Sequence, residues 1–169
     1  MRATWHYYEY DSDFFYMHYL KETIVNEMYD VVPMTNEQKE SYSLLYVLRE
    51  SVKNVLDAIT TYNLTSDSKK SYSVILKVEQ STDQLVLKIK DVGCGFPHLE
   101  RGVQEKRVED KLNFTPDEKS DGSHLGGMRL GLNNMCKHIL LKNGEMFIKN
   151  RKHGGATVTI KYPTPLSVF

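Results

Sequence analysis

The sequence has few cysteines, no net charge and no long apolar run. Its two cysteines, Cys94 and Cys136, are not spaced like metal ligands, which suits a reducing compartment. The 22 basic residues equal the 22 acidic residues, so no overall field attracts nucleic acid or an anionic membrane. No apolar run approaches the roughly twenty residues that span a bilayer, and the N-terminal MRATWHYYEY lacks the apolar core of a signal peptide. We therefore expect one soluble, cytoplasmic domain over residues 1–169, with no nucleic-acid partner and no membrane partner.

The first third of the chain predicts a strand and two helices. The aromatic run over 3–10 is typical of a strand, and a helix is expected to open near Asp11 or Ser12, so that both elements lie within 1–34. Thr35 and Gln38 have capping-box spacing and start a long helix that extends to about Tyr62. One apolar stripe of this helix recurs every three or four residues and faces a core: Leu45, Leu48, Val52, Val55 and Ile59.

The aromatic N-terminus allows two interpretations. Its rings belong to Trp5, Tyr7, Tyr8, Tyr10, Phe14, Phe15, Tyr16 and Tyr19. Such rings can stack on the bases of a single-stranded nucleic acid. Only Arg2 and Lys21 lie nearby to hold phosphates, so core packing or self-association, for example as a homodimer, is the favoured interpretation.

The remainder predicts two hairpins around a long connection and a helix. Strands over 72–80 and 84–91 are joined by the turn STD, and strands over 145–151 and 156–163 are joined by KHGG. Residues 97–127 show weak periodicity and many charges, as in a functional lid or a disordered segment. A helix from about Met128 then ends at Gly144. This order predicts an α+β fold, a two-layer sandwich of a mostly antiparallel sheet with helices on one face.

Three groups of residues are candidates for a functional site. The first is Glu50, Asn54 and Asp57, which the spacing places on one helix face opposite the apolar stripe. A solvated face has the same pattern, and taken alone this group favours that interpretation. The functional alternative is a carboxylate for proton transfer one turn from an amide oxygen that can ligate Mg²⁺.

The second group is Asp91-x-Gly93-x-Gly95, which begins at the last residue of a predicted strand. It is not a dinucleotide fingerprint, because a third glycine is absent and Pro97 follows in place of a helix. A plain turn is one interpretation. In the other, the glycines let the backbone approach a flat ligand, and the ionised carboxylate accepts a hydrogen bond from an exocyclic amine.

The third group is GGMRLGLNN, residues 126–134, at the start of the penultimate helix. Glycines that lead into a helix N-terminus can bind an anion through free backbone N–H groups. Arg129 adds a phosphate donor. A single glycine-rich turn is weak evidence, but the order and spacing of the three groups together are specific.

Together the three groups resemble the GHKL superfamily, the ATP-binding fold of gyrase, the heat-shock chaperone, histidine kinases and the MutL mismatch-repair protein. The matching segments are ESVKN, DVGCG, GMRLGL and GGAT, and the resemblance covers about Ser41 to Pro163. It implies ATP and Mg²⁺ as ligands and an ATP lid over 97–127. Arg129 stands where the family usually has glycine, and Asp57 stands where histidine kinases usually carry a basic residue.

The resemblance also implies a role for each matching residue. Glu50 would be the catalytic residue that activates the attacking hydroxyl or water, and Asn54 would hold the metal. Asp91 would bond the adenine amine, with support from Thr157. The remaining nucleotide-binding residues would shape the base pocket or meet the phosphates: Gly93, Gly95, Gly126, Gly127, Arg129, Leu130, Gly131 and Leu132.

Three functions fit this resemblance. In layout the chain looks most like the stand-alone anti-sigma-factor serine kinases, which would give it a sigma factor or a small antagonist protein as its regulatory partner. The first alternative is a detached histidine-kinase-like catalytic domain, although the sequence offers no phosphoacceptor: His18 is followed by Tyr19 and not by an acidic residue. The second alternative is a binding module in which ATP sets lid conformation with little turnover.

Overall fold

The structure is a computed structural model that describes residues 2–11, 16–96, 99, 101–102, 104–111 and 123–163. The elements, in chain order, are β1 (Arg2–Tyr10), α1 (Met17–Val31), α2 (Asn36–Ser41), α3 (Leu44–Thr65), β2 (Tyr72–Gln80), β3 (Gln84–Lys90), β4 (Lys106–Arg107), the 3₁₀ helix η1 (Val108–Lys111), α4 (Ser123–Leu141), β5 (Glu145–Asn150) and β6 (Ala156–Pro163). Among the helices in these ranges, none is long and apolar enough to cross a membrane.

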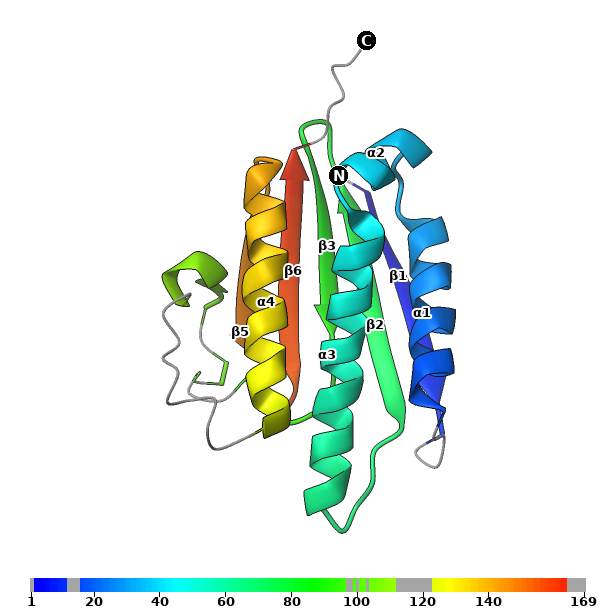
Figure 1. Ribbon diagram of the computed structural model, residues 1–169, viewed down its shortest axis with the longest axis vertical. Coiled ribbons are helices and arrows are strands. Elements are labelled where there is room, and N and C mark those ends of the chain that lie inside the picture. Colours follow the sequence, from blue (N-terminus) through cyan, green and yellow to red (C-terminus); the bar gives the residue numbers. More distant parts are fainter. Residues whose placement is uncertain are drawn as a thin grey trace.

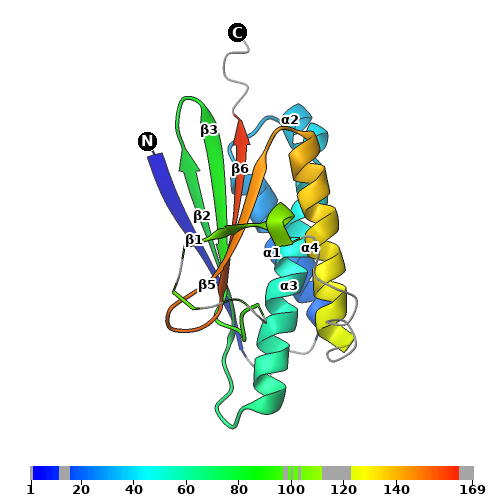
Figure 2. The same cartoon turned by 90° about the vertical axis from the view of Figure 1, so that its left-hand side faces the viewer.

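The strands form a single six-stranded sheet in the order β1-β2-β3-β6-β5-β4. Each neighbouring pair of strands is antiparallel. Helices α1, α3 and α4 lie side by side on one face of this sheet (Figure 1), and the view along the sheet shows the opposite face without a helix (Figure 2). The predicted α+β two-layer sandwich is therefore confirmed.

The core lies between the sheet and the three long helices. Strand alternation sends every second side chain toward the helices, as the buried Tyr72, Val74, Leu76 and Val78 of β2 show. In the predicted stripe of α3, Leu48, Val52, Val55 and Ile59 are buried, whereas Leu45 is partly buried. The largest fully buried side chains of the other elements include Leu20, Ile24, Met28, Leu87, Ile89, Leu132, Met135 and Tyr162. This packing fixes α3 above the centre of the sheet.

The predicted long helix after Thr35 is wrong, because the chain forms two helices there. The capping box is confirmed: the Thr35 hydroxyl accepts a hydrogen bond from the Gln38 amide at 3.1 Å, and the Thr35 amide donates to the Gln38 side chain at 2.9 Å. Helix α2 then stops, and Ser43 adopts a left-handed backbone with φ of 54°. The NEQKES segment of α2 has no apolar stripe that could pack on the core, so the helix does not continue. The turn at Ser43 changes the chain direction before α3 begins.

The start of α1 also differs from the prediction. The helix begins at Met17, whereas the sequence suggested Asp11 or Ser12; Asp11 is not helical, and Ser12 lies outside the described residues. The buried side chains of α1 begin only at Leu20. Helix formation depends on burial of this apolar stripe, so the helix starts one turn before the stripe.

The segment 97–127 contains regular structure that the sequence did not predict. Strand β4 pairs antiparallel with β5 at the sheet edge, and η1 follows it directly. Helix α4 begins at Ser123, so the last residues of the predicted lid are helical. Pro97 and residues 112–122 lie outside the described residues. The ATP-lid role of this segment stays a prediction.

Replacement of the capping threonine tests the start of α2. We expect Thr35→Ala to lower the free energy of unfolding by about 1 kcal/mol, because the Gln38 amide loses its hydrogen bond to the Thr35 hydroxyl, whereas the backbone amide of residue 35 can still donate to the Gln38 side chain. Urea denaturation followed by circular dichroism measures this change. Thr82→Ala, in the exposed turn between β2 and β3, is the matched control and should shift the free energy by less than about 0.5 kcal/mol. Equal effects of both substitutions would contradict the capping role.

Candidate functional site

A cleft lies between α3 and the ends of β3 and β6 that meet at the middle of the sheet. Its lining residues are Ser51, Asn54, Val55, Ala58, Asp91, Gly95, Phe96, Ala156 and Val158. The predicted residues Asn54, Asp91 and Gly95 therefore share one cleft, although they are far apart in the sequence. The enclosed space is about 20 Å³, which is room for about one water molecule. A larger ligand enters only if the lining moves.

Asp91 is held at the end of β3 by backbone groups. Its carboxylate Oδ1 accepts hydrogen bonds from the amides of Gly93 at 2.8 Å and Ala156 at 3.3 Å. Its own backbone amide donates to the Ala156 carbonyl at 3.0 Å, and Arg151 Nη1 donates to the Asp91 carbonyl at 2.8 Å. Within the described part of the chain, Oδ2 makes no hydrogen bond. This second oxygen is therefore available to a donor in the cleft.

The ionisation of Asp91 follows from its burial. The side chain is 7% exposed, and burial raises the pKa of Asp91 to about 6. The amides of Gly93 and Ala156 oppose this rise, as do the charges of Arg151 and Lys70. With this pKa the carboxylate is mostly ionised at pH 7.5. It can then accept a charge-assisted hydrogen bond.

Glycine is required where the loop after β3 meets its neighbours. A Cβ at Gly93 would lie 2.7 Å from the carbonyl carbon of Ala58 in α3. Gly95 has φ of +80°, and a Cβ there would lie 2.7 Å from Asn150 Oδ1. These contacts place the backbone of the loop against α3 on one side and β5 on the other. The surface that they leave for a ligand is made of backbone and has no bulky side chain at either glycine.

A third glycine, Gly155, makes the closest approach in the site. It has φ of +80°, and a Cβ there would lie 2.7 Å from the carbonyl carbon of Asp91 and closer still to its oxygen. Its carbonyl accepts a hydrogen bond from the Arg151 amide at 2.9 Å, which closes the β5–β6 hairpin. The hairpin can therefore reach the end of β3 only with glycine at this position.

Asn150 has a role that the sequence did not reveal. This buried residue ends β5, and its Oδ1 accepts from the Phe96 amide at 2.7 Å. Its Nδ2 donates to the carbonyls of Phe96 at 2.8 Å and Leu99 at 2.7 Å. One side chain thus holds both ends of the segment that leaves the cleft. The only signal was an asparagine at the end of a predicted strand, which does not identify such a clamp.

The residues of the first predicted group, Glu50, Asn54 and Asp57 on α3, do not all lie at the cleft. Asn54 lines the cleft, and Glu50 lies one turn away against α4, where a Cβ on Gly131 would be 3.2 Å from Glu50 Oε1. The structure thus brings together the predicted Glu50 and Gly131. All three residues of the group are partly buried, so this face is not simply solvated, but Asp57 is not among the cleft residues.

The glycine-rich group does not precede a helix. Helix α4 begins at Ser123, so Gly126 and Gly127 lie inside it and the predicted helix start is wrong. The backbones of Arg129 and Leu130 are also helical, and their side chains lie outside the described part of the structure. Leu132 is buried in the core. Among the residues of this group whose surroundings the structure describes, Gly131 lies next to another predicted site residue, Glu50.

Thr157 is placed away from the cleft. Its neighbours Ala156 and Val158 line the cleft, so strand alternation directs the Thr157 side chain to the other face of the sheet. The predicted support of Asp91 comes instead from the Ala156 amide. The GGAT segment was correctly located, but its contact is made by the backbone one residue earlier.

The described residues include no cluster of three or more His, Cys, Asp or Glu side chains that could hold a metal ion. Asn54 supplies a neutral amide oxygen next to the cleft. Mg²⁺ is often held by one or two side-chain oxygens together with phosphate oxygens. This donor set therefore fits Mg²⁺ that arrives with a phosphate ligand.

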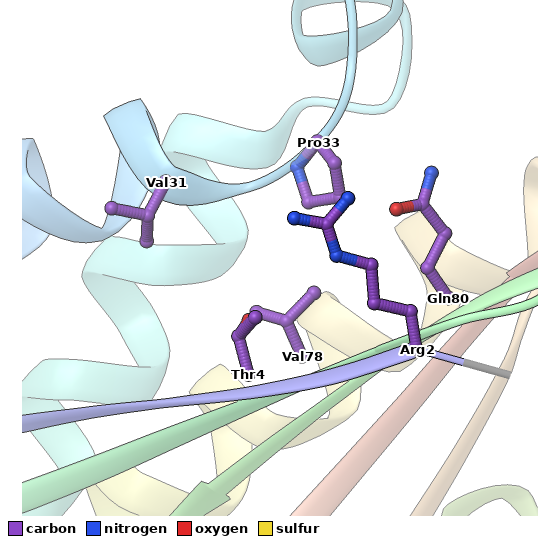
Figure 3. A pocket seen from close by; sticks show the side chains of 6 residues that line it. All are labelled: Arg2, Thr4, Val31, Pro33, Val78 and Gln80. Carbon is purple, nitrogen blue, oxygen red and sulfur yellow. The ribbon is translucent and has the colours of Figure 1, made fainter.

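A second hollow, of about 140 Å³, lies at the opposite end of the sheet between β1, β2 and the end of α1. Its lining residues are Arg2, Thr4, Val31, Pro33, Val78 and Gln80, and the Arg2 side chain reaches toward Pro33 (Figure 3). None of the predicted site residues lines it. The cleft beside Asp91 is therefore the candidate site.

A family model matches residues 40–166, which include every predicted site residue from Glu50 to Thr157. The family is described as histidine kinase-, DNA gyrase B-, and HSP90-like ATPase. A search of curated proteins finds no match. Strand β1 and helix α1 lie outside the matched range but belong to the same sheet and helix layer.

A pair of glycine substitutions tests the close approach at the hairpin. Gly155→Ala should lower the free energy of unfolding by about 1–3 kcal/mol, because the added carbon collides with the Asp91 backbone. Gly102→Ala is the matched control: its φ is +72°, but the nearest atom would be 3.5 Å away. The two variants share backbone strain and differ in the collision. Equal stabilities in urea denaturation would show that no collision occurs.

Proposed function

The chain belongs to the family of histidine kinase-, DNA gyrase B- and HSP90-like ATPases, which implies ATP binding, and on this premise we propose that it is a protein serine kinase of the anti-sigma-factor type. In this proposal Mg–ATP binds in the cleft beside Asp91. The terminal phosphoryl group passes to a serine of a regulatory partner protein. The observation that carries the proposal is the buried carboxylate of Asp91, with one oxygen fixed by amides and the other available in the cleft.

In this proposal adenine is recognised by the ionised carboxylate of Asp91. Oδ2 accepts a hydrogen bond from the exocyclic amine of the base, while Oδ1 stays bound to the amides of Gly93 and Ala156. The absence of side chains at Gly93 and Gly95 lets a flat ring approach the backbone. The base also requires the Phe96 side of the cleft to open, because the enclosed space is far smaller than a purine.

The triphosphate would extend from the base pocket along α3 toward Glu50. Asn54, which lines the cleft one helical turn from Glu50, would hold Mg²⁺ through its amide oxygen. Gly126, Gly127, Arg129, Leu130 and Gly131 of α4 are the proposed phosphate contacts. Support for this comes from Gly131, whose backbone lies against the Glu50 carboxylate.

Glu50 is the proposed proton acceptor. A serine hydroxyl of the partner attacks the terminal phosphorus, the bond from that phosphorus to the bridging oxygen breaks, and ADP leaves. Glu50 takes the hydroxyl proton as the new phosphorus–oxygen bond forms. The carboxylate is only partly buried and lies one helical turn from Asn54, which places a base next to the metal ligand.

The choice of a serine kinase rests on layout. Strand β1 and helix α1 precede the Glu50 helix, with the short α2 between α1 and α3, and β1 joins the common sheet; a leading strand and helix resemble the layout of the anti-sigma-factor serine kinases. None of the six histidines is followed by an acidic residue, which is the usual context of a histidine phosphoacceptor. The partner would be a sigma factor or a small antagonist protein.

Asp91→Asn should change affinity and stability in opposite directions. Loss of the charged hydrogen bond should weaken ATP binding by roughly ten- to a hundredfold in calorimetry. The same substitution should raise the free energy of unfolding at pH 7.5 by on the order of 2 kcal/mol, because it removes a buried charge. Asp67→Asn, on an exposed loop, should alter neither quantity. Unchanged ATP affinity in Asp91→Asn would show that Asp91 does not bind the adenine base.

The pKa of Asp91 also predicts how the wild type responds to pH. The folded pKa, about 6, is above the ordinary value of 3.8, so stability from this group is highest at low pH and is lost as pH rises from about 4 to about 6. ATP affinity should change in the opposite sense and fall as pH decreases through 6. In Asp91→Asn both dependences should disappear from this window. Calorimetry and urea denaturation at pH 4.5, 6 and 7.5 measure them.

Glu50→Gln tests the proton acceptor and preserves the size of the side chain beside Gly131. ATP affinity should stay within about threefold of the wild type, whereas phosphoryl transfer should fall by at least a hundredfold. Glu40→Gln, on the exposed surface of α2, is the control and should retain the native rate. Native transfer by Glu50→Gln would show that another group accepts the proton.

Labelled ATP with candidate partner proteins separates the serine kinase from its alternatives. Acid-stable phosphate on a partner serine supports the proposal. Acid-labile phosphohistidine would favour the histidine-kinase-like function. Tight Mg–ATP binding without transfer or hydrolysis would favour the ATP-gated binding module.

A further inference from the structure

The face of the sheet opposite the helices carries aromatic and basic side chains, interrupted in β6 by the buried Thr157 and Thr159. Strand pairing aligns Trp5, Lys77, Lys88, Thr159, Phe147 and Arg107 in one row across all six strands. A second row contains Tyr7, Ile75, Lys90, Thr157 and Lys149. No described helix covers this face (Figure 2). We call these two rows and Lys161 the open face.

Positive charge is concentrated on the open face although the chain has no net charge. Lys77 lies directly opposite Lys88, and like charges in this position destabilise a sheet. The pKa of Lys90 is lowered, first by burial and then by the charges of Arg151, Lys77, Lys88 and Lys149. The acidic groups here are few. Glu79 pairs with Lys77 at 3.1 Å and Lys88 at 3.5 Å. Arg107 pairs with Glu145 at 2.7 Å and with Glu109 at 3.8 Å, and Glu9 accepts from Ser71 at 2.7 Å.

Aromatic rings lie among these cations. Trp5 is 44% exposed and Tyr7 is 69% exposed, and their rings stack with centroids 6.4 Å apart at 12°. The ammonium groups of Lys77 and Lys90 lie 4.7 and 4.9 Å from the Trp5 ring centre. At the other end of the row, Phe147 has Arg107 at 4.9 Å and Lys161 at 4.8 Å. Rings are therefore adjacent to cations toward both ends of the row, and they are exposed at Trp5 and partly buried at Phe147.

We propose that the open face binds single-stranded nucleic acid, with bases stacked on Trp5 and Tyr7 and phosphates held by the lysines. Stacking platforms beside a basic track are how proteins bind single strands without sequence preference. The row from Trp5 to Phe147 crosses four strand spacings, or about 19 Å, so it fits a polymer better than a free nucleotide. An acidic polypeptide could pair with the lysines, but its carboxylate side chains would not stack on the two exposed rings.

The fold removes the reasons that argued against a nucleic-acid partner in the sequence. Those reasons were the zero net charge and the presence of only Arg2 and Lys21 near the aromatic run. The pairing of β1 with β2, and of β2 with β3, brings Lys77 and Lys90 to Trp5 from more than seventy residues away in the sequence. Overall charge is also a poor guide here, because strand pairing gathers several cations on one face.

The open face is separate from the ATP cleft. Ala156 and Val158 point into the cleft, whereas Thr157 between them belongs to the open face. The two sites are on opposite sides of the sheet. Binding of single-stranded nucleic acid can therefore be measured with saturating Mg–ATP in the cleft. If the nucleic acid does not bind, the proposed kinase function is unaffected.

The tryptophan offers a direct assay, because Trp5 is the only one in the chain. Titration with the oligonucleotides dT12 and rU12 in saturating Mg–ATP should quench its fluorescence. Contacts to about four phosphates predict a slope near −3 in a plot of log affinity against log salt. An affinity that is independent of salt, or the absence of quenching at 50 mM salt, would overturn the proposal.

Matched variants locate the site on the open face. Lys77→Gln with Lys149→Gln should weaken binding of fluorescein-labelled dT12 at least fivefold, whereas Lys137→Gln with Lys142→Gln, exposed on the helix side, should weaken it less than twofold. Tyr7→Ala should weaken it about tenfold through lost stacking. Circular dichroism and ATP affinity, neither of which these substitutions should change, verify folding. Equal losses in the two double variants would overturn the proposal.

Two competitors distinguish the ligand class. Polyglutamate should displace dT12 only at much higher concentration, and duplex DNA should compete less well than dT12 at equal phosphate concentration. If polyglutamate binds as tightly as dT12 and Tyr7→Ala has no effect, the open face is a site for acidic polypeptide and the proposal is wrong. If the duplex binds as tightly, stacking does not contribute and the proposal is equally overturned.

Discussion

The close approach of two backbones, at Gly155 and Asp91, is the constraint on which the site depends. The β5–β6 hairpin lies so near the end of β3 that no side chain fits between them. This contact brings the Ala156 amide to the Asp91 carboxylate and the Arg151 guanidinium to the Asp91 carbonyl. It also positions Asn150, which holds Phe96 and Leu99. The orientation of the carboxylate, the shape of the cleft and the path of the chain out of it therefore follow from one glycine.

Much of the fold could be predicted from the sequence because it depends on local patterns. Alternation located the strands of both hairpins to within a residue or so, and the Thr35–Gln38 spacing identified a real capping box. The errors occurred where tertiary contacts override local preference. The helix predicted from Thr35 is broken at Ser43, where α3 turns its apolar stripe onto the core and the NEQKES segment has no such stripe. Helix α4 starts at Ser123, before the apolar pattern from which its start was predicted.

The candidate site was predictable to the extent that it consists of short motifs. Asn54, Asp91 and Gly95 share the cleft, and Glu50 lies next to Gly131. Thr157 was misplaced because a one-residue difference in a strand reverses the direction of a side chain. Asn150 was missed because its importance comes from three backbone groups that are distant in sequence. The open face could not be foreseen either, because its rows are defined by strand pairing.

The small size of the cleft has a kinetic consequence. With about 20 Å³ of space in the cleft, a purine would fit only after the lining moves, so association would depend on the fraction of time the cleft is open. If ATP binds here as proposed, its departure would need the same movement. The mobility of the cleft lining, rather than contact with the base alone, would then set the rate of nucleotide exchange.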